Sequence, residues 1–296
     1  MRTFDEYRIL VEKRLPAMVP AVLYHARTIH DSMLYSLTAG GKRLRPVMML
    51  AACELAGGDI QVAMPYACAI EFIHTYSLVH DDLPAMDDDE LRRGKPTNHM
   101  IYGAGMATLA GDGLLNSAFE VMINDISGCP ADMVKSRILA AKTIVEGSGV
   151  NGMIAGQVAD IEAENAGETA SEELLEFIHL NKTAALIKAS IKAGLYLGGA
   201  GPELHEAMDE YSSQLGLAFQ IADDILDVTG TTEEIGKPVG SDEAANKLTF
   251  VSVYGLDEAR KKLHEHSQLA IKALDEIDGD TEFFRKLAEK LEKRSK

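Results

Sequence analysis

The chain has 296 residues, of which 46% are hydrophobic, and this length and composition allow one large globular domain with a full-sized core. It carries 46 acidic against 29 basic side chains, a formal net charge of -17. That charge argues against a general nucleic-acid-binding surface or an anionic-membrane surface. The sequence therefore predicts that any anionic ligand is held by a few locally placed cations.

Cysteine usage and the N-terminus indicate the compartment. The three cysteines, Cys53, Cys68 and Cys129, are odd in number and lack CxxC spacing, which fits a reducing environment better than a disulfide framework. The first residues, MRTFDEYRILVEKRL, lack the apolar core of a signal peptide, and no run of about 18 apolar residues occurs. We expect a cytoplasmic protein without a stable membrane anchor, with buried and inert thiols.

Apolar residues recur at three- and four-residue spacing along most of the chain, which is the period of helices and not of strands. Short Gly-rich breaks at 39–41, 56–58 and 197–201 separate the helical segments. No linker, abrupt change of composition or fixed repeat marks a domain boundary. We predict an all-α fold, with one domain over residues 1–296.

The first acidic cluster lies in LVHDDLPAMDDDELRRGKPT, which has five aspartates within nine positions. The preceding apolar helix should end near Leu83, because the proline that follows disfavours helical geometry there. Asp81 and Asp82 then sit at a helix C-terminus, where the helix dipole disfavours anions. Their presence suggests an external cation. His74, Ser77 and Asp81 share one stripe of this helix.

The second acidic cluster, LGLAFQIADDILDVTG, has the pattern of one helix. At about 100° per residue, Gln220, Asp223 and Asp227 fall on one stripe, with Asp224 to the side. Apolar residues occupy most of the remaining circumference, so this stripe should face a polar cavity inside the fold. Carboxylates this close repel one another unless a cation compensates them. Oxygen ligands without Cys or paired His favour Mg²⁺, which also uses substrate phosphates as ligands.

A further segment, VTGTTEEIGKPVGSDEAANK, is rich in Gly, Thr and Pro, and a structureless stretch of this length is typical of a functional lid. Arginine and lysine side chains that could bind phosphate occur near these motifs. They are Lys42, Arg45, Arg92, Arg93, Lys182, Lys237 and Lys247. Each of them, and each acidic cluster alone, is also compatible with an ordinary solvated surface.

Six blocks occur in order along the chain: GGKRLRP, HTYSLVHDDLPAMDDDELRRGKPT, GQVAD, NKTAALI, FQIADDILD and GKPVGSD. With them the sequence closely resembles the short-chain trans-prenyl diphosphate synthases of bacterial type, from about residue 40 to 250. The resemblance implies a helical bundle around a deep central cavity, assembled as a homodimer. It also implies about three magnesium ions per active site, with manganese as an alternative, bridging an allylic diphosphate to two Asp-rich motifs.

The resemblance also implies roles for individual residues. The metal ligands would be Asp81, Asp82, Asp87, Asp223, Asp224 and Asp227. Isopentenyl diphosphate would be bound by Lys42, Arg45, His74 and Arg93. The allylic diphosphate would be bound by Arg92, Lys182, Lys237 and Lys247. The polar groups near the developing allylic cation would be Thr183 and Gln220. Gln157 and Asp160 would orient neighbours, and Arg294 would close over the second diphosphate.

The reaction implied is Mg²⁺-assisted ionisation of the allylic diphosphate, followed by attack of the isopentenyl double bond and loss of a proton, for which released pyrophosphate is the expected base. In the family, the positions four and five before the first aspartate influence product length. Here they are Ser77 and Tyr76. Because Ser77 is small and Tyr76 carries a ring, we expect farnesyl diphosphate, with geranylgeranyl diphosphate as the alternative. An ideal helix places Tyr76 about 140° from Asp81, so the allylic tail would have to lean sideways.

Three other readings remain open at the level of sequence. A metal-dependent phosphohydrolase of HD type would use the His-Asp dyad at His80 and Asp81, but it leaves the second cluster unexplained. A terpene cyclase would share the first motif, but normally has a different second site. A silent regulatory subunit is a non-enzymatic alternative, against which the intact acidic motifs argue.

Overall fold

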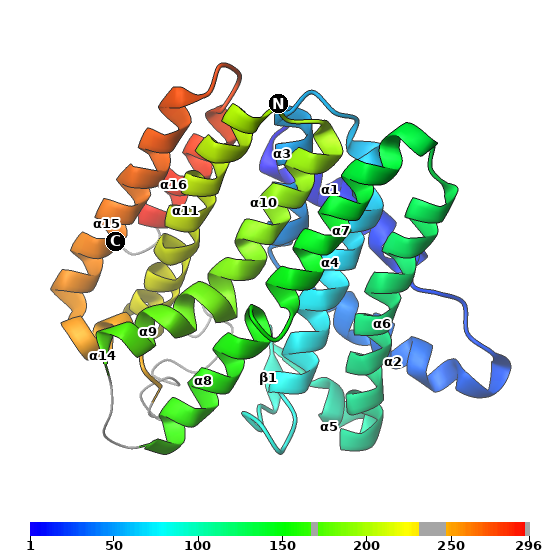
Figure 1. Ribbon diagram of the computed structural model, residues 1–296. Helices are drawn as coiled ribbons and strands as arrows, with labels where there is room; N and C mark the ends of the chain where they lie inside the picture. The colour runs from blue at the N-terminus through cyan, green and yellow to red at the C-terminus, as the bar shows by residue number, and fades with distance from the viewer. Residues whose placement is uncertain (167–170, 231–246, 294–296) are drawn as a thin grey trace.

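The computed structural model describes residues 1–166, 171–230 and 247–293, and these are almost entirely helical (Figure 1). The predicted all-α class is confirmed. Within the described residues the strands form one antiparallel hairpin, β1 (Leu91–Arg92) with β2 (Lys95–Pro96).

The helices of the N-terminal half are α1 (Phe4–Arg14), α2 (Arg27–Leu37), α3 (Leu44–Leu55), α4 (Ile60–Asp81), α5 (Asn98–Tyr102), α6 (Ala104–Gly128) and α7 (Val134–Ser148). The later helices are α8 (Met153–Ala166), α9 (Glu172–Ile178), α10 (Ala185–Gly198), α11 (Pro202–Thr229), α14 (Phe250–Tyr254), α15 (Leu256–Ala273) and α16 (Glu282–Lys293). Between α9 and α10 the chain forms a π-helical turn, η4 (His179–Ala184), and short 3₁₀ turns are η1 (Leu15–Met18), η2 (Tyr24–Ala26), η3 (Ala131–Met133) and η5 (Leu274–Glu276).

Helix α4 occupies the middle of the bundle, between α10 and α6 (Figure 1), and packs against α3, α6 and α10. Asp59 caps its N-terminus by accepting a hydrogen bond from the Gln61 N–H at 2.9 Å. Most of its residues are buried, and they occur on every side of the helix, which is typical of a helix at the centre of a core. The first acidic motif is therefore held at the end of a helix in the core of the bundle.

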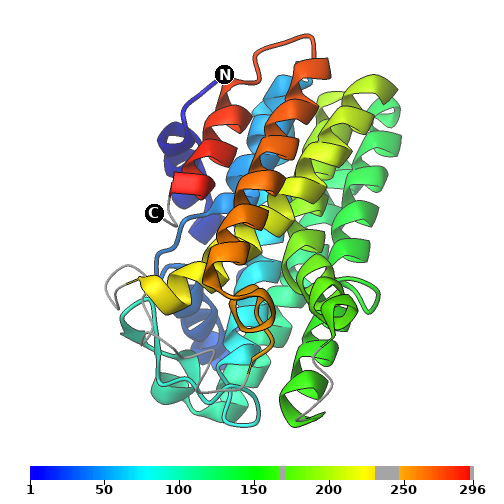
Figure 2. The same ribbon diagram turned by 90° about the vertical axis from the view of Figure 1, so that its left-hand side faces the viewer.

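The apolar side chains form two clusters. The larger one joins α1, α3, α4, α6, α7, α10 and α16, and the smaller one lies among α9, α11, α14 and α15. Helix α11 contributes to both: Leu215 belongs to the larger cluster, and Ile221 and Ile225 to the smaller one. Its C-terminal half, which carries the second acidic motif, is therefore packed on α14 and α15, as the side view suggests (Figure 2).

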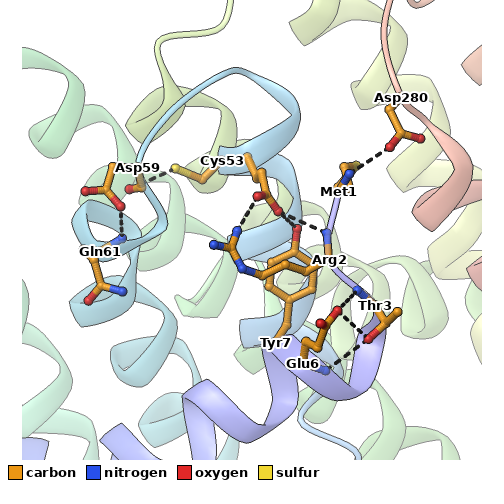
Figure 3. Close-up of polar contacts among 10 residues, drawn as sticks. Met1, Arg2, Thr3, Glu6, Tyr7, Cys53, Asp59, Gln61 and Asp280 are labelled. Carbon is orange, nitrogen blue, oxygen red and sulfur yellow. Dashed lines mark hydrogen bonds and ion pairs between the residues drawn. The ribbon is translucent and has the colours of Figure 1, made fainter.

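The N-terminal segment is fixed to the body by polar contacts (Figure 3). Glu54 on α3 accepts hydrogen bonds from the Tyr7 hydroxyl and from Arg2. The Met1 ammonium lies 2.8 Å from Asp280, just before α16. Aromatic contacts between α1 and α16 add to these links. The N-terminus is therefore fixed to Asp280 and α16 beside the cavity described below.

Sequence expectations for local structure are largely met. Helix α4 ends at Asp81 with Asp82 as its cap. A tighter turn follows it, in which the Leu83 N–H donates to the His80 carbonyl at 3.2 Å.

Cys53 and Cys68 are buried, but Cys129 is partly exposed because it caps the surface end of α6. The prediction of buried thiols is therefore wrong for Cys129. None of the helices in the described ranges has the length and apolar character needed to cross a bilayer.

Candidate active site

A large cavity of about 1780 Å³ opens between the helices. Its wall includes residues of α3, α4, α6, α8, η4, α11 and α16, with the β1–β2 hairpin and the N-terminal segment at its edge. Asp81 at the end of α4 and Asp223 on α11 both line it. Two acidic side chains about 140 positions apart in sequence therefore line one cavity, as expected if they act on one ligand.

The three aspartates of the first motif have different surroundings. Asp81 faces the cavity, and burial, joined by the charges of Asp87 and Asp82, raises the pKa of its carboxyl to about 6 against the opposing effect of Lys182. Asp82 is buried and forms an ion pair with Arg92, whose Nε donates at 2.7 Å. Asp87 lies next to Asp81, because its N–H donates to the Asp81 carbonyl at 2.9 Å.

The three aspartates of the second motif also differ in their surroundings. Asp223 lines the cavity, whereas Asp224 and Asp227 are buried and are not part of its wall. Both carboxylate oxygens of Asp224 accept hydrogen bonds, one from the Gln220 amide at 2.8 Å and one from the Phe250 N–H at 2.8 Å. The predicted stripe therefore lines the cavity at Gln220 and Asp223, and Asp227, one turn further along, is buried.

The π-helical turn η4 presents Lys182 and Thr183 to the same cavity. π-Helical turns often occur at functional sites. The Lys182 ammonium lies 2.5 Å from the buried Asp160 on α8. The Thr183 hydroxyl donates to Gln220 on α11 at 2.7 Å. These contacts fix a cation and two polar groups on the cavity wall, in line with the orienting role expected of Asp160.

The turn is pressed closely against α8 at Gly156. A Cβ atom there would lie 2.1 Å from the backbone nitrogen of Lys182. Only a glycine allows this approach without displacement of the backbone. Gln157, the next residue of the GQVAD block, lines the cavity. The glycine of that block thus sets the position of Lys182.

A group of arginines surrounds His74 on α4. Arg45, Arg93 and His74 all line the cavity wall. Burial first, and then the positive charges of Arg45 and Arg93, hold the pKa of His74 well below its usual value. The imidazole is therefore neutral at pH 7. Glu71, almost fully buried, supplies the opposing negative charge near these arginines.

Lys42 also lines the cavity and precedes α3. Arg93 reaches back from the hairpin and donates to the Gly40 carbonyl. At Gly41, with φ +124°, a Cβ would lie only 2.4 Å from the Arg93 guanidinium. Gly41 therefore leaves room for the Arg93 guanidinium, and the Gly40 carbonyl accepts its hydrogen bond.

The remaining predicted residues are placed as follows. Tyr76 and Ser77 both line the cavity, as does Arg92. Lys247 lies 3.4 Å from Asp87 and 3.9 Å from Glu164, outside the cavity wall. Lys237, Arg294 and most of the predicted lid at 228–247 lie outside the described residues.

Three residues near this site have no role in it that the sequence predicted. Arg43 forms a buried ion pair with Glu71 at 2.6 Å; it lies within GGKRLRP but was not distinguished from its neighbours. Glu71 gave no signal, because a single acidic residue in an apolar helix has no distinctive spacing. His80, considered only as half of an HD dyad, also lines the cavity, with its Nε2 3.0 Å from the Thr108 carbonyl.

The donor set suits magnesium and does not suit a protein-only metal cage. Within the described ranges, no group of three or more His, Cys, Asp or Glu side chains converges to hold a metal ion. Mg²⁺ commonly binds through one or two carboxylates together with substrate phosphates and water. Asp81 and Asp223 supply such carboxylates on one cavity, and the raised pKa of Asp81 indicates a carboxylate that a nearby cation would stabilise.

Comparisons with known proteins agree on one family. A family model described as polyprenyl synthetase matches residues 26–282. Farnesyl diphosphate synthase of Geobacillus stearothermophilus is 47% identical over 253 residues, covering 85% of this chain and 84% of that protein. A chloroplastic geranylgeranyl pyrophosphate synthase of Capsicum annuum is 46% identical over 274 residues, covering 92% of this chain and 72% of that protein.

Solved structures show the same fold. A geranyltransferase from Legionella pneumophila is 33% identical, with a TM-score of 0.85, and the match covers 99% of this chain and 96% of that one. An FPP/GFPP synthase from Zymomonas mobilis is 30% identical, with a TM-score of 0.84, over 98% of this chain and 97% of that one.

Proposed function

Because the chain belongs to the polyprenyl synthetase family, we propose that it is a prenyltransferase that makes farnesyl diphosphate. It would condense isopentenyl diphosphate head-to-tail with dimethylallyl and then geranyl diphosphate, the geranyltranstransferase reaction. The observation that carries this proposal is that Asp81 and Asp223, from two distant motifs, line one large cavity together with Lys182, Arg45 and Arg93. Such a site can bind two diphosphates and accommodate the apolar tails of the substrates.

The carboxylates would hold magnesium at the allylic diphosphate. Bound Mg²⁺ neutralises the charge that develops on a departing diphosphate. Asp81 and Asp223 are best placed for this, since both face the cavity. Asp82 and Asp224 belong to the same proposed ligand set, but their contacts with Arg92, Gln220 and Phe250 suit them to fix the positions of neighbouring groups. Asp87 and Asp227 complete the set.

Side chains around the leaving diphosphate would assist its departure. Lys182 and Arg92 line the cavity near Asp81 and are each oriented by a carboxylate, Asp160 and Asp82 respectively. Preorganised cations stabilise developing negative charge without reorganisation during the reaction. Lys247 and Lys237 would complete this side of the site.

The oxygens of Thr183 and Gln220 would face the allylic carbon as positive charge develops on it. Both residues line the cavity, and the chain of hydrogen bonds from Thr183 to Gln220 to Asp224 fixes the direction of the Gln220 amide. Negative ends of fixed dipoles stabilise a cation more effectively than mobile water does, and unlike water they do not capture it.

The second substrate would bind at the group of arginines around His74. Arg45, Arg93 and Lys42 can donate to its diphosphate, and arginine suits bidentate contacts with phosphate oxygens. Because His74 is neutral, it can hydrogen-bond the diphosphate without having to be protonated beside the arginines.

Product length would depend on Tyr76 and Ser77, which line the cavity on the turn before Asp81. Tyr76 is only 7% exposed, so its ring borders the space available to the growing tail without reaching solvent. Relatives of similar identity make either farnesyl or geranylgeranyl diphosphate, so geranylgeranyl diphosphate is the alternative product. Tyr76→Ala should lengthen the products, and chromatography of the dephosphorylated alcohols measures this; an unchanged distribution would count against Tyr76 as the floor.

One incubation tests the activity. The purified full-length chain is mixed with Mg²⁺, isopentenyl diphosphate and dimethylallyl, geranyl or farnesyl diphosphate, and the products are separated by chain length. Growth to fifteen carbons is expected, and growth to twenty would favour the alternative. Asp223→Asn should abolish most activity, whereas Asp209→Asn, on the same helix and outside the cavity wall, serves as the matched control.

Release of phosphate or pyrophosphate without chain growth would instead favour a hydrolase of HD type. The contacts of His80 disfavour that reading, because its Nε2 is directed at the Thr108 carbonyl at 3.0 Å and not at a metal shared with Asp81. Absence of any turnover by the wild type would favour a regulatory subunit.

A homodimer is also part of the proposal. Four apolar side chains on α5 and α6, each at least 51% exposed, support it: Met100, Ile101, Leu109 and Ile123. These two helices lie together at one edge of the bundle (Figure 1), and a self-complementary patch is the usual basis of a two-fold dimer. Light scattering should give twice the chain mass, and a monomer would contradict the proposal.

The single domain over residues 1–296 and the cytoplasmic location remain expectations.

A further inference from the structure

We propose that His80 is a specificity-determining residue, seated in a notch made by Gly111, that braces the ring of Tyr76 and so sets the length of the product. The inference rests on the proposed prenyltransferase function. It adds α6 to the determinants of product length, which the sequence motif places on α4 alone.

The two rings are in contact along α4. Tyr76 and His80 are four residues apart and therefore lie on one face of the helix. Their ring centroids are 5.7 Å apart with an interplanar angle of 78°, which is an edge-to-face arrangement. Long side chains on a helix lean toward its N-terminus, so His80 covers the turn that carries Tyr76. Both residues line the cavity.

A hydrogen bond anchors His80 to the neighbouring helix. Its Nε2 lies 3.0 Å from the Thr108 carbonyl oxygen on α6. A carbonyl can only accept, so Nε2 carries the proton and donates it. Asp112 lies farther away, at 3.9 Å from the same nitrogen. The imidazole thus spans the space between α4 and α6 and is held at the α6 end.

Gly111 provides the space in which the imidazole lies. A Cβ atom at this position would be 2.0 Å from Nε2, 2.3 Å from Cδ2 and 2.8 Å from Cε1 of His80. The ring therefore occupies the volume that any other residue at 111 would fill. One turn further along α6, Leu115 lines the cavity. The α6 side of the cavity is thus formed by His80, inserted from α4, and by Leu115.

This arrangement links the identity of residue 111 to the position of Tyr76. Gly111→Ala must move the imidazole by roughly 1.4 Å, the difference between 2.0 Å and the 3.4 Å at which ordinary contact begins. The close packing of α4 against α6 leaves the cavity side as the open direction. Loss of the imidazole, by contrast, leaves the Tyr76 ring without its edge-to-face neighbour and opens space beside it.

The experiment measures product length for a set of full-length variants with geranyl and isopentenyl diphosphates and Mg²⁺. His80→Ala should raise the ratio of products longer than the wild-type product by roughly tenfold, the discrimination expected when a contact of this size is lost from an apolar pocket. Gly111→Ala should shift the distribution toward shorter products. In the His80→Ala background, Gly111→Ala should have little further effect, because the clashing ring is gone.

Gly105→Ala is the matched control. Gly105 lies on the same helix, and a Cβ there meets nothing within 4 Å, so its products should equal those of the wild type. Thermal melting of each variant monitors folding. If Gly111→Ala does not fold, the comparison of His80→Ala with the double variant still decides, because neither contains the clash.

Unchanged product lengths in a folded His80→Ala variant would overturn the proposal, since a residue that only stabilises packing alters the melting temperature and not the product. If Gly111→Ala changes product length as much in the His80→Ala background as it does in the wild type, the role of the notch is overturned. Failure of the wild type to extend any allylic diphosphate would instead refute the proposed function, so the two failures are distinguishable.

Discussion

Glu71 is predicted to be essential for stability, because it is the buried counter-charge of the arginine group. Its carboxylate is 1% exposed and accepts from the Arg43 Nη1 at 2.6 Å, while the Arg43 Nη2 donates to the Leu37 carbonyl at 2.7 Å. The charge of Glu71 also favours the charged forms of Arg45 and Arg93. One carboxylate therefore faces three arginines.

Glu71→Gln keeps the shape of the side chain and removes the charge. The amide oxygen can still accept from Arg43, but the arginine then remains as an uncompensated cation in the interior. Breaking a buried pair by removing one partner costs about 3–5 kcal/mol. Since one hydrogen bond survives, we expect a loss of about 3 kcal/mol in the free energy of unfolding, measured by urea denaturation.

Two comparisons sharpen this test. Glu146→Gln breaks an exposed pair with Lys142, whose atoms lie 3.6 Å apart, and should change stability by at most about 0.5 kcal/mol. Inorganic pyrophosphate should restore part of the stability of Glu71→Gln, because an anion bound at Arg45 and Arg93 replaces the missing charge. A loss below about 1 kcal/mol for Glu71→Gln would refute the role of Glu71 as counter-charge.

The remaining predictions concern packing and reactivity. Gly156→Ala places a methyl group against the backbone of Lys182, so it should cost about 1–3 kcal/mol of stability and lower kcat more than Gly105→Ala does; equal kcat for the two variants would contradict the role given to Gly156. Burial raises the pKa of the Cys53 thiol to about 12, which leaves about one thiolate in ten thousand at pH 8. Iodoacetamide should therefore modify the partly exposed Cys129 first, as read by mass spectrometry, and rapid labelling of Cys53 in the native protein would contradict its burial. Because the pKa of Cys53 is raised on folding, its contribution to stability is full below pH 9 and is lost as the pH rises toward 12.

Much of the fold could be predicted from local pattern. The apolar period predicted helices, and residues 215–229 are part of one helix, α11, with Gly230 as its C-cap. The proline after Leu83 located the end of α4 to within two residues. These features depend on interactions within a few residues, which the sequence displays directly.

Features that depend on contacts between distant segments were not predictable in the same way. A helical wheel separates Tyr76 from Asp81, yet both line the cavity, because a space of about 1780 Å³ beside α4 borders more than one face of the helix. The wheel also placed Asp227 on the stripe of Asp223, but it could not show that Asp227 is buried while Asp223 lines the cavity. The π-helical turn at Lys182 has no sequence period of its own.

The net charge of -17 and the anionic substrates proposed here are reconciled by where the charges lie. Two cations of the cavity wall are each held by a buried carboxylate: Arg92 by Asp82, and Lys182 by Asp160. In the absence of ligand the carboxylate offsets the desolvation of the cation and fixes its direction. When a diphosphate binds, the cation is already oriented, and the site gains a new negative partner without moving. The acidic residues that orient these cations would therefore be as necessary to the proposed anion site as the basic ones, which is how a strongly acidic chain could carry it.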